Sequence, residues 1–429
     1  MSFSPVLACY RGAVAALGPF AGLWLEQRAR AGKEDASRLG ERFGHYSQAR
    51  PSGPLVWLHG ASVGESGVAL QLIAALSARE PRFNFLLSSG TRTSAELIAK
   101  RASANTTHVY APLDRLDAVR GFLEHWRPDL GVFVESEMWP NLILEAQAQG
   151  APLALANARM SPSSLARLAR WPGASKRLLE AFKLVLAADT RTADALSALL
   201  GRPIPCVGNL KLAAPAPPVD AQALAALRAE IGARRVWLAA STHAGEDEIL
   251  LEAHARVCAA VPDALLIIAP RHPERGEAVA ALAQAPRRSL RQPIAGASAY
   301  VADTLGELGL LYSLSSVALI GGSLLPHLKG HNPVEAARLG SAILTGPNVE
   351  SFADLFDAFF EASAATRVVS AQEIADAITT FWRDEPARER QTEAARRVVE
   401  GAADTLDETV SRLMPLAPAR KPEVANASA

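Results

Sequence analysis

Residues 56–65 read VWLHGASVGE, and residues 236–246 read VWLAASTHAGE. Each segment begins with a short apolar run typical of a buried strand and ends in Gly-Glu, where a helical pattern begins. Apolar strands and helical stretches keep alternating after both segments, and this alternation predicts a parallel sheet covered by helices. The near-repetition of strand and turn, one residue longer the second time, therefore predicts two similar, doubly wound α/β domains.

The domain boundaries follow from the same pattern. We expect strands at residues 55–59, 83–88, 130–134, 152–156 and 184–188 in the first half, and at 236–240, 265–269, 299–303, 317–320 and 342–344 in the second. Between the halves, the proline-rich residues 212–220 (LAAPAPPVD) are typical of a stiff, extended linker. The sequence therefore predicts a first domain at 36–211 and a second at 221–415, closed by a helical stretch at 371–413, with a flexible tail at 416–429.

Composition excludes several classes of protein. The chain has 429 residues with 44 Lys and Arg against 44 Asp and Glu, so its formal net charge of zero gives no reason to expect a nucleic acid partner. Its length suits two or three domains, and its 49% hydrophobic content is ordinary for a globular protein. The three cysteines are far apart, which argues against a disulfide framework or a cysteine zinc site.

The first 35 residues carry a different signal. The uncharged run at 12–25 (GAVAALGPFAGLWL) is shorter than the roughly 20 residues that span a bilayer. Arg11 precedes this run, and Arg28, Arg30 and Lys33 follow it, close to Trp24. This pattern favours a helix lying in the headgroup region of an anionic membrane, with an amphipathic core helix and a signal peptide as the alternatives.

Candidate functional residues lie where predicted strands end, because ligands of open α/β sheets bind beyond the carboxyl ends of the strands. In the first half, one acidic segment contains Ser62, Gly64 and Glu65, and a second contains Glu135 and Glu137. A third set is basic and polar and consists of Arg92, Asn157 and Arg159. The acidic groups suit proton transfer or the binding of hydroxyls, and the arginines suit an anionic ligand.

The second half offers candidates for binding a phosphate or a ribose. They are Ser241, Thr242 and His243; Pro270, Arg271 and His272; Gly321, Gly322 and Ser323; and Asn332 and Glu335. An arginine between rigid turns binds two phosphate oxygens well, and Gly-Gly-Ser exposes backbone amides. We expect Asn332 to cap a helix that has Pro333 at its first position, which would direct the positive end of that helix toward a phosphate.

One segment supports a different enzyme class. Residues 60–64 (GASVG) also fit G-x-S-x-G, the nucleophile turn of α/β-hydrolases, in which Ser62 would attack the substrate. A serine hydrolase and a catalytically inactive membrane adaptor remain open as interpretations at this stage.

Taken in order, the segments WLHGASVGE, ESEMWPN, NARMS, GNLKL, STHAGEDE, PRHPER, DTLGELGLLY, GGSLLPH and GHNPVEAA resemble those of the 3-deoxy-D-manno-octulosonic acid (Kdo) transferases of lipopolysaccharide biosynthesis. The resemblance runs from the N-terminal segment over nearly the whole chain. It implies GT-B architecture, with two Rossmann-like domains and a cleft between them. Two departures stand out: Lys329 replaces the first glycine of G-G-H-N-P-L-E, and Leu212-Ala213 replaces an aromatic-Asp pair after Lys211.

The resemblance also implies a reaction, in which an inverting glycosyltransferase moves Kdo from CMP-Kdo to the lipid A precursor (lipid IVA). Glu65 holds the position of the catalytic base, and the other first-half candidates would bind the acceptor or Kdo. Lys211 and the second-half candidates would bind the nucleotide. We find no Asp-x-Asp motif and expect neither a metal nor a cofactor. The implied location is the cytoplasmic face of the bacterial inner membrane, held by residues 1–35.

Overall fold

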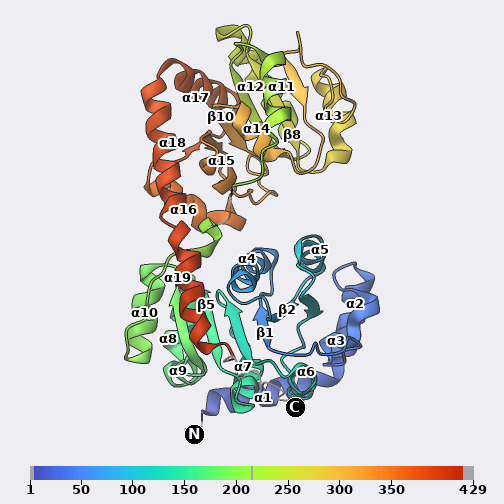
Figure 1. The fold of residues 1–429 in the computed structure, drawn as a ribbon, viewed down its shortest axis with the longest axis vertical. Coiled ribbons are helices and arrows are strands. Elements are labelled where there is room, and N and C mark those ends of the chain that lie inside the picture. Colours follow the sequence, from blue (N-terminus) through green and yellow to red (C-terminus); the bar gives the residue numbers. More distant parts are fainter. Residues whose placement is uncertain (1–3, 214–215, 419–429) are drawn as a thin grey trace, which may run out of the picture. The chain divides into compact units, whose positions relative to one another are not determined.

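The computed structural model describes residues 4–213 and 216–418, which form two compact units (Figure 1). The first unit runs to Lys211 and takes up the chain again at Asp404, and the second unit runs from Leu212 to Ala403. We describe each unit by itself.

The first unit is built on a six-stranded parallel sheet with the order β3-β2-β1-β4-β5-β6. Its strands are β1 (Leu55–His59), β2 (Asn84–Ser89), β3 (Thr106–Tyr110), β4 (Leu130–Val134), β5 (Leu153–Ala158) and β6 (Phe182–Ala187). Its helices beyond the N-terminal segment are α3 (Leu39–Arg42), α4 (Val63–Arg79), α5 (Arg92–Arg101), α6 (Leu116–Trp126), α7 (Pro140–Ala148), α8 (Pro162–Arg170), α9 (Pro172–Leu179), α10 (Thr190–Leu200) and α19 (Ala403–Leu413).

Alternation along β1 shows why helices cover both faces of this sheet. Leu55 and Trp57 belong to one buried cluster, and Val56 and Leu58 belong to another. Successive side chains of a strand point to opposite faces, so a strand that is apolar throughout requires cover on each side. Part of that cover on the Val56 face comes from α19, whose Leu413 is fully buried in the same cluster.

The second unit repeats this design. Its strands are β7 (Val236–Thr242), β8 (Leu265–Pro270), β9 (Ala299–Val301), β10 (Val317–Ile320), β11 (Ala342–Thr345) and β12 (Thr366–Arg367), in the order β12-β11-β10-β7-β8-β9. Read from the other edge, this is the strand order of the first unit. Its helices are α11 (Ala221–Ile231), α12 (Glu246–Ala260), α13 (Gly276–Ala283), α14 (Leu308–Leu314), α15 (Val334–Arg338), α16 (Ala353–Glu361), α17 (Ala371–Arg383) and α18 (Glu385–Glu400).

The predicted α/β fold with two doubly wound units is confirmed, and three predicted strands, β1, β4 and β10, have the observed bounds. Two strands were not predicted. The sequence of β3, TTHVY, is too polar to resemble a buried strand, because β3 is an edge strand, and β12 has only two residues. The helical stretch at 371–413 consists of three helices, and the last of them, α19, groups with the first unit rather than with the second, where the sequence had placed it.

The N-terminal segment consists of α1 (Pro5–Leu17), a 3-10 turn (Gly18–Phe20) and α2 (Ala21–Arg30). The helical stretch Pro5–Arg30 has 26 residues, and its most apolar 18-residue window has a mean hydropathy of 1.4, so it is long and apolar enough to cross a membrane by length and composition alone. The uncharged run at 12–25 is only part of this helical stretch, which is why the sequence suggested a segment too short to span a bilayer. Arg11 Nε donates to Asn141 Oδ1 at 2.9 Å, and Arg115 donates to the carbonyl of Gly18 at 2.6 Å, so polar contacts hold the segment to the first unit.

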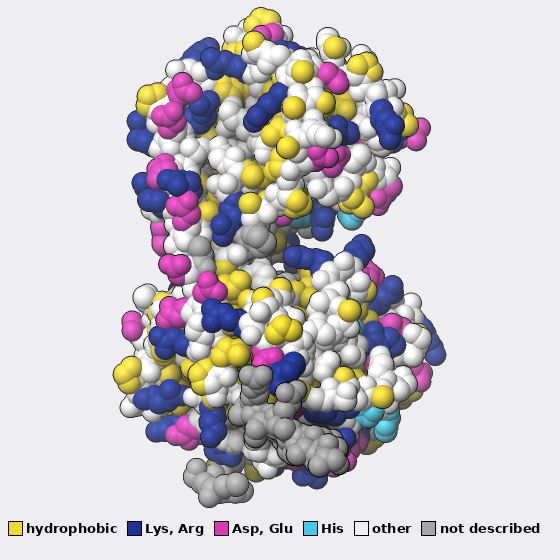
Figure 2. All heavy atoms as spheres, in the orientation of Figure 1, with side chains coloured by type: hydrophobic (Ala, Val, Ile, Leu, Met, Phe, Trp, Pro, Cys, Tyr) yellow, Lys and Arg dark blue, Asp and Glu magenta, His cyan; other side chains and the backbone are white. Residues whose placement is uncertain are grey.

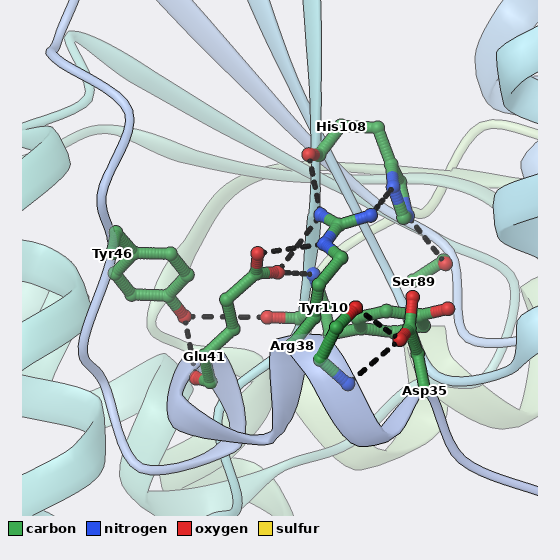
Figure 3. A network of polar contacts seen from close by, with 8 residues as sticks. Asp35, Arg38, Glu41, Tyr46, Ser89, His108 and Tyr110 are labelled. Carbon is green, nitrogen blue, oxygen red and sulfur yellow. Dashed lines mark hydrogen bonds and ion pairs between the residues drawn. The ribbon is translucent and has the colours of Figure 1, made fainter.

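A polar network fastens the residues after this segment to β3 (Figure 3). Arg38 donates to both carboxylate oxygens of Glu41 and to the carbonyl of His108, and Glu41 accepts from the amide of Tyr110 at 2.7 Å. Arg38 also lies 3.2 Å from His108 Nδ1. A guanidinium only donates, so Nδ1 accepts, and His108 Nε2 carries the proton that it shares with Ser89 Oγ at 2.9 Å. Burial lowers the pKa of His108 to about 3, which keeps it neutral.

Charges of both signs are interspersed on the face of the molecule shown in Figure 2. This agrees with the equal numbers of basic and acidic residues in the sequence.

Candidate active site

Glu65 lies at the carboxyl end of β1, in the first turn of α4, next to the point where the strand order of the first sheet reverses. Ser62 caps this helix, since its hydroxyl accepts from the amide of Glu65 at 3.3 Å. In return, Glu65 Oε2 accepts from the amides of Ala61 at 2.6 Å and Ser62 at 3.2 Å. A Cβ atom on Gly60 would lie 3.0 Å from the backbone of Glu65, so this turn requires glycine. The capping box thus fixes one oxygen of Glu65.

The other carboxylate oxygen of Glu65 behaves differently. Among the residues that the structure describes, no hydrogen bond reaches Oε1 of Glu65. Burial is the largest cause that raises the pKa of Glu65, and the negative charges of Glu137 and Glu135 add to it. Against the lowering effect of the Ser62 hydrogen bonds, these causes together raise the pKa to about 7. A carboxylate with one unbound oxygen and a pKa near neutrality is suited to accept a proton at physiological pH.

Two more acidic residues follow β4. Glu135 forms an ion pair with Lys211, whose Nζ lies 2.6 Å from Glu135 Oε1. Glu137 accepts from the indole N–H of Trp139, and burial raises its pKa. His59 Nε2 lies 4.0 Å from Glu137 Oε2, but burial lowers the pKa of His59 to about 3, so this imidazole is neutral and forms no ion pair. Glu65, Glu135, Glu137 and Lys211 therefore form one cluster, which we call the acidic site.

Lys211 was predicted to bind the nucleotide, whereas the structure places it in the acidic site of the first unit. A Cβ atom on Gly64 would lie 3.6 Å from Lys211 Cε, so the lysine also packs against the Glu65 turn. Asn157 positions it, because Asn157 Oδ1 accepts from the amide of Leu210 at 2.8 Å. The sequence did not reveal this neighbourhood, since Lys211 lies far from the other residues along the chain.

Backbone strain occurs near the ends of strands in both units. Glu135, Asn157 and Ser241 have φ angles of 64°, 53° and 60°, in the left-handed region that residues other than glycine seldom adopt. Strained residues of this kind gather at functional sites, where the surrounding structure holds them in place.

Two predicted anion-binding arginines have other partners. Arg159 Nε lies 3.5 Å from Asp189, the residue that caps α10. Arg92 donates to the carbonyl of Gly32 at 3.1 Å and lies 3.8 Å from Glu96. In the part of the chain that the structure describes, Arg92 shows no ion pair with Glu65, Glu135 or Glu137.

In the second unit, Glu246 occupies the position that Glu65 has in the first. Glu246 is fully buried, and its carboxylate accepts from four backbone amides: those of His243 at 2.9 Å, Gly322 at 2.8 Å, Ser323 at 3.0 Å and Leu324 at 3.0 Å. The amide of Gly321 donates to Ala240. The predicted role of the Gly321–Ser323 amides in holding a phosphate is therefore revised, because a carboxylate and a carbonyl of the protein already occupy them.

Three histidines gather beside this loop. His243 Nε2 and His331 Nε2 are 2.9 Å apart, their rings stack with centroids 5.1 Å apart, and the ring of His272 lies 5.8 Å from that of His243. Burial lowers the pKa of His331 to about 4, with a smaller lowering from Arg271. Gly322 has a φ of 68° and lies against His331, so only glycine fits there. Both Arg271 and His272 are exposed, and Arg271 is close enough to this group to act on His331 through its charge.

The remaining nucleotide candidates have structural contacts. Thr242 is buried and donates to Asp247 at 2.8 Å, and Pro270 ends β8 opposite Thr242. Asn332 Oδ1 accepts from the amide of Val334 at 3.0 Å, at the start of the five-residue helix α15 that carries Glu335. Within the described residues, no group of three or more His, Cys, Asp or Glu side chains is arranged to hold a metal ion.

Comparison with known proteins places this chain in a family. Residues 37–214 match the family described as "3-Deoxy-D-manno-octulosonic-acid transferase (kdotransferase)". The chain is 32% identical, over 96% of both sequences, to a protein of Arabidopsis thaliana named "Probable 3-deoxy-D-manno-octulosonic acid transferase, mitochondrial". The chain belongs to the Kdo transferase family. The Kdo transferase of Haemophilus influenzae is 32% identical over 88% of this chain and 91% of its own. The chain is therefore a Kdo glycosyltransferase of lipopolysaccharide biosynthesis.

Solved structures agree on the fold of this Kdo transferase. The UDP-GlcNAc 2-epimerase of Neisseria meningitidis has a TM-score of 0.54 and 14% identity, and covers 84% of this chain and 100% of its own. MurG of Acinetobacter baumannii has a TM-score of 0.53 and 12% identity, and covers 85% and 100%. At these identities the likeness shows the fold alone, which is the predicted GT-B architecture.

The hydrolase alternative has no support in these findings. Ser62 Oγ accepts from the amide of Glu65, and among the described residues no histidine forms a hydrogen bond with it. A serine nucleophile needs such a base beside it.

Proposed function

We propose that this protein transfers Kdo from CMP-Kdo to the lipid A precursor lipid IVA with inversion at the anomeric carbon, and that Glu65 is the catalytic base. The observation that carries the proposal is the Glu65 carboxyl group, which is held by the capping box, retains one unbound oxygen and has a pKa raised to about 7. Membership of the Kdo transferase family supports the donor and the sugar.

In this reaction Glu65 takes the proton from an acceptor hydroxyl as that oxygen bonds to the anomeric carbon. The bond from the anomeric carbon to the phosphate oxygen breaks on the opposite face, and CMP leaves with the electron pair. Glu135 and Glu137 raise the proton affinity of Glu65, and both carboxylates also accept hydrogen bonds well. We assign hydroxyl binding on the acceptor or Kdo to Glu135, Glu137 and Lys211.

The nucleotide belongs to the second unit in this proposal. Arg271 is the exposed cation beside the histidine group, so we assign the phosphate of CMP to Arg271, His272 and His331. Glu246 holds the Gly321–Ser323 loop in shape and does not itself bind the nucleotide. The expected cleft between the units concerns their relative placement and stays a prediction.

We also propose that the N-terminal segment binds the cytoplasmic face of the inner membrane. Leu17, Phe20, Leu23 and Trp24 are exposed by 67%, 64%, 69% and 50%. Arg30 and Lys33 extend beyond them at the basic end of the segment. An apolar face with a cationic border suits an anionic leaflet, and the acceptor is itself a lipid.

The test is CMP release from CMP-Kdo with lipid IVA as the acceptor, together with mass spectrometry of the glycolipid. We expect Glu65→Gln to lower turnover at least 100-fold, because general base catalysis contributes about 10²–10⁴-fold, while CMP binding persists. Ser62→Ala separates this assignment from the hydrolase alternative, since it removes the candidate nucleophile together with a helix cap that stabilises by ~1 kcal/mol. Normal turnover in Glu65→Gln, or loss of turnover in a folded Ser62→Ala protein, would refute the assignment.

A further inference from the structure

A cavity of about 430 Å³ lies between the N-terminal segment and the body of the first unit. Its walls include Val14, Leu17, Phe20 and Trp24 from the segment, and Leu113 and Trp139 from the body. No function discussed so far uses this cavity.

The polar groups in its walls are already bound to one another. Tyr10 donates to Asp114 at 2.8 Å, and Asp114 also accepts from the amides of Asn141 at 3.0 Å and Leu142 at 2.8 Å. Arg115 donates to Gly18 and forms an ion pair with Asp117. A polar ligand would find few partners here, whereas an apolar one would bury its surface against aliphatic and aromatic side chains.

The rim of the cavity shows where such a ligand comes from. Leu17, Phe20 and Trp24 line the cavity and are at least half exposed. The surface that we propose to insert into the membrane is therefore continuous with the cavity wall. Arg28 lies 4.9 Å over the ring of Trp24, and Arg30 is 84% exposed in the same last turn of α2, so cations stand beside the rim where lipid phosphates lie.

The inner wall leads to the acidic site. Trp139 lines the cavity, and its indole N–H donates to Glu137. Glu137 in turn acts on Glu65 through its charge. One side chain therefore separates the cavity from the carboxylates assigned to the acceptor sugar. A membrane phospholipid has no sugar to bind to those carboxylates. The connection between the cavity and the acidic site through Trp139 therefore favours the acceptor lipid over bulk lipid.

We propose that this cavity binds one acyl chain of the acceptor lipid, and that the bound chain places the acceptor's sugar at the acidic site. The inference rests on the proposed function and adds to it a cause of acceptor selectivity. The bound chain leaves bilayer hydrocarbon rather than water, so its binding depends on close contact with the cavity walls, and a shorter chain makes fewer of these contacts. Wild-type KM is then expected to rise as the acyl chains of the acceptor are shortened, with kcat little changed.

The test compares Val14→Trp, which fills the cavity, with Ala15→Trp, which adds the same indole on the exposed side of α1. Both variants are assayed in vesicles of phosphatidylethanolamine and phosphatidylglycerol. We expect Val14→Trp to raise KM for the acylated acceptor at least tenfold over Ala15→Trp, while both variants bind vesicles equally and both match wild type with a deacylated acceptor. Equal KM values for the two variants would overturn the proposal, as would a Val14→Trp defect that persists with the deacylated acceptor.

A second measurement does not depend on turnover. An acceptor carrying a diazirine at the end of an acyl chain is photolysed in the same vesicles, and the labelled peptides are mapped by mass spectrometry. We expect labels on residues 14–24 and on Trp139, reduced by Val14→Trp and by competing acceptor. If a diazirine phospholipid labels these residues equally and the acceptor does not displace it, the cavity holds bulk lipid and the inference fails, whatever Glu65→Gln does to turnover.

Discussion

Replacing Glu65 with glutamine should make the protein more stable as well as inactive, and the gain should depend on pH. Burial and the neighbouring carboxylates raise the pKa of Glu65 from 4.5 to about 7. A carboxyl group whose pKa is raised in the folded state stabilises the fold below its unfolded pKa. That contribution is lost as the pH rises through the folded value, because the folded protein must then ionise a buried group.

The magnitude follows from this shift. A shift of roughly 2.5 pKa units at ~1.36 kcal/mol each gives about 3 kcal/mol of stability that the wild-type protein loses between pH 4.5 and pH 7.5. Glutamine cannot ionise, yet its carbonyl oxygen still accepts from the amide of Ala61. Glu65→Gln should therefore gain about 3 kcal/mol over wild type on going from pH 4.5 to pH 7.5.

The assay is thermal unfolding of both proteins at pH 5 and pH 8. For a unit of this size, roughly 2 °C per kcal/mol or more is expected, so the Tm difference between variant and wild type should grow by ~6 °C. Glu96→Gln, an exposed carboxylate in α5, controls for the loss of one negative charge. A Tm difference that is the same at both pH values would refute the argument that the Glu65 carboxyl group resists ionisation, and with it the physical basis for a base poised near neutrality.

Three further predictions follow from other contacts. Lys211→Met removes the cation 2.6 Å from Glu135. Loss of a positive charge near the carboxylates should move the acidic limb of the pH profile for CMP release to higher pH, and turnover at pH 7 should fall ~10-fold. An unchanged acidic limb would contradict the role assigned to Lys211. Glu246→Gln places a side-chain NH₂ group among four backbone amides that now donate to a carboxylate. The second unit should lose ~3 kcal/mol of folding stability, and its CMP affinity, measured by calorimetry, should drop. Unchanged CMP affinity would contradict the proposal that Glu246 supports the Gly321–Ser323 loop. His108 has a pKa lowered to about 3 from 6.5, so it destabilises the fold as the pH falls below 6.5. In denaturant titrations at pH 5, His108→Gln should remove up to ~2 kcal/mol of that loss. Equal pH slopes for variant and wild type would show that the pKa of His108 is not lowered by folding.

Local patterns were sufficient to predict most of the fold. Trp57 and Trp237 mark two apolar strands that need cover on both faces, and the Gly-Glu turns after them begin the next helices. What local patterns missed depends on distant residues. Strand β3 is held at the sheet edge by Arg38 and Glu41, which come from another part of the chain. Its polar sequence gives no sign of this support.

The candidate site shows the same limit. The sequence pointed to the strand ends, but the role of each residue there depends on its partner. Glu65 and Glu246 lie in equivalent turns. The backbone amides of the loop at Gly322 donate to both carboxylate oxygens of Glu246, whereas among the described residues no such loop donates to Oε1 of Glu65. The resemblance implied nucleotide binding for Lys211, whereas the contact between Asn157 and the amide of Leu210 holds Lys211 beside Glu135. Such partnerships arise only when the sheet has formed.

The return of α19 to the first unit sets an order for biosynthesis. The second unit is one continuous stretch, Leu212–Ala403, so it is complete on the nascent chain before Asp404 is added. Synthesis of the first unit begins earlier, but Val410 and Leu413, which pack in its core with Val56, are added only near the end of translation. The apolar residues of the first unit that pack against α19 therefore stay without this cover while the second unit is synthesised. The unit that is translated first is the last to complete its core.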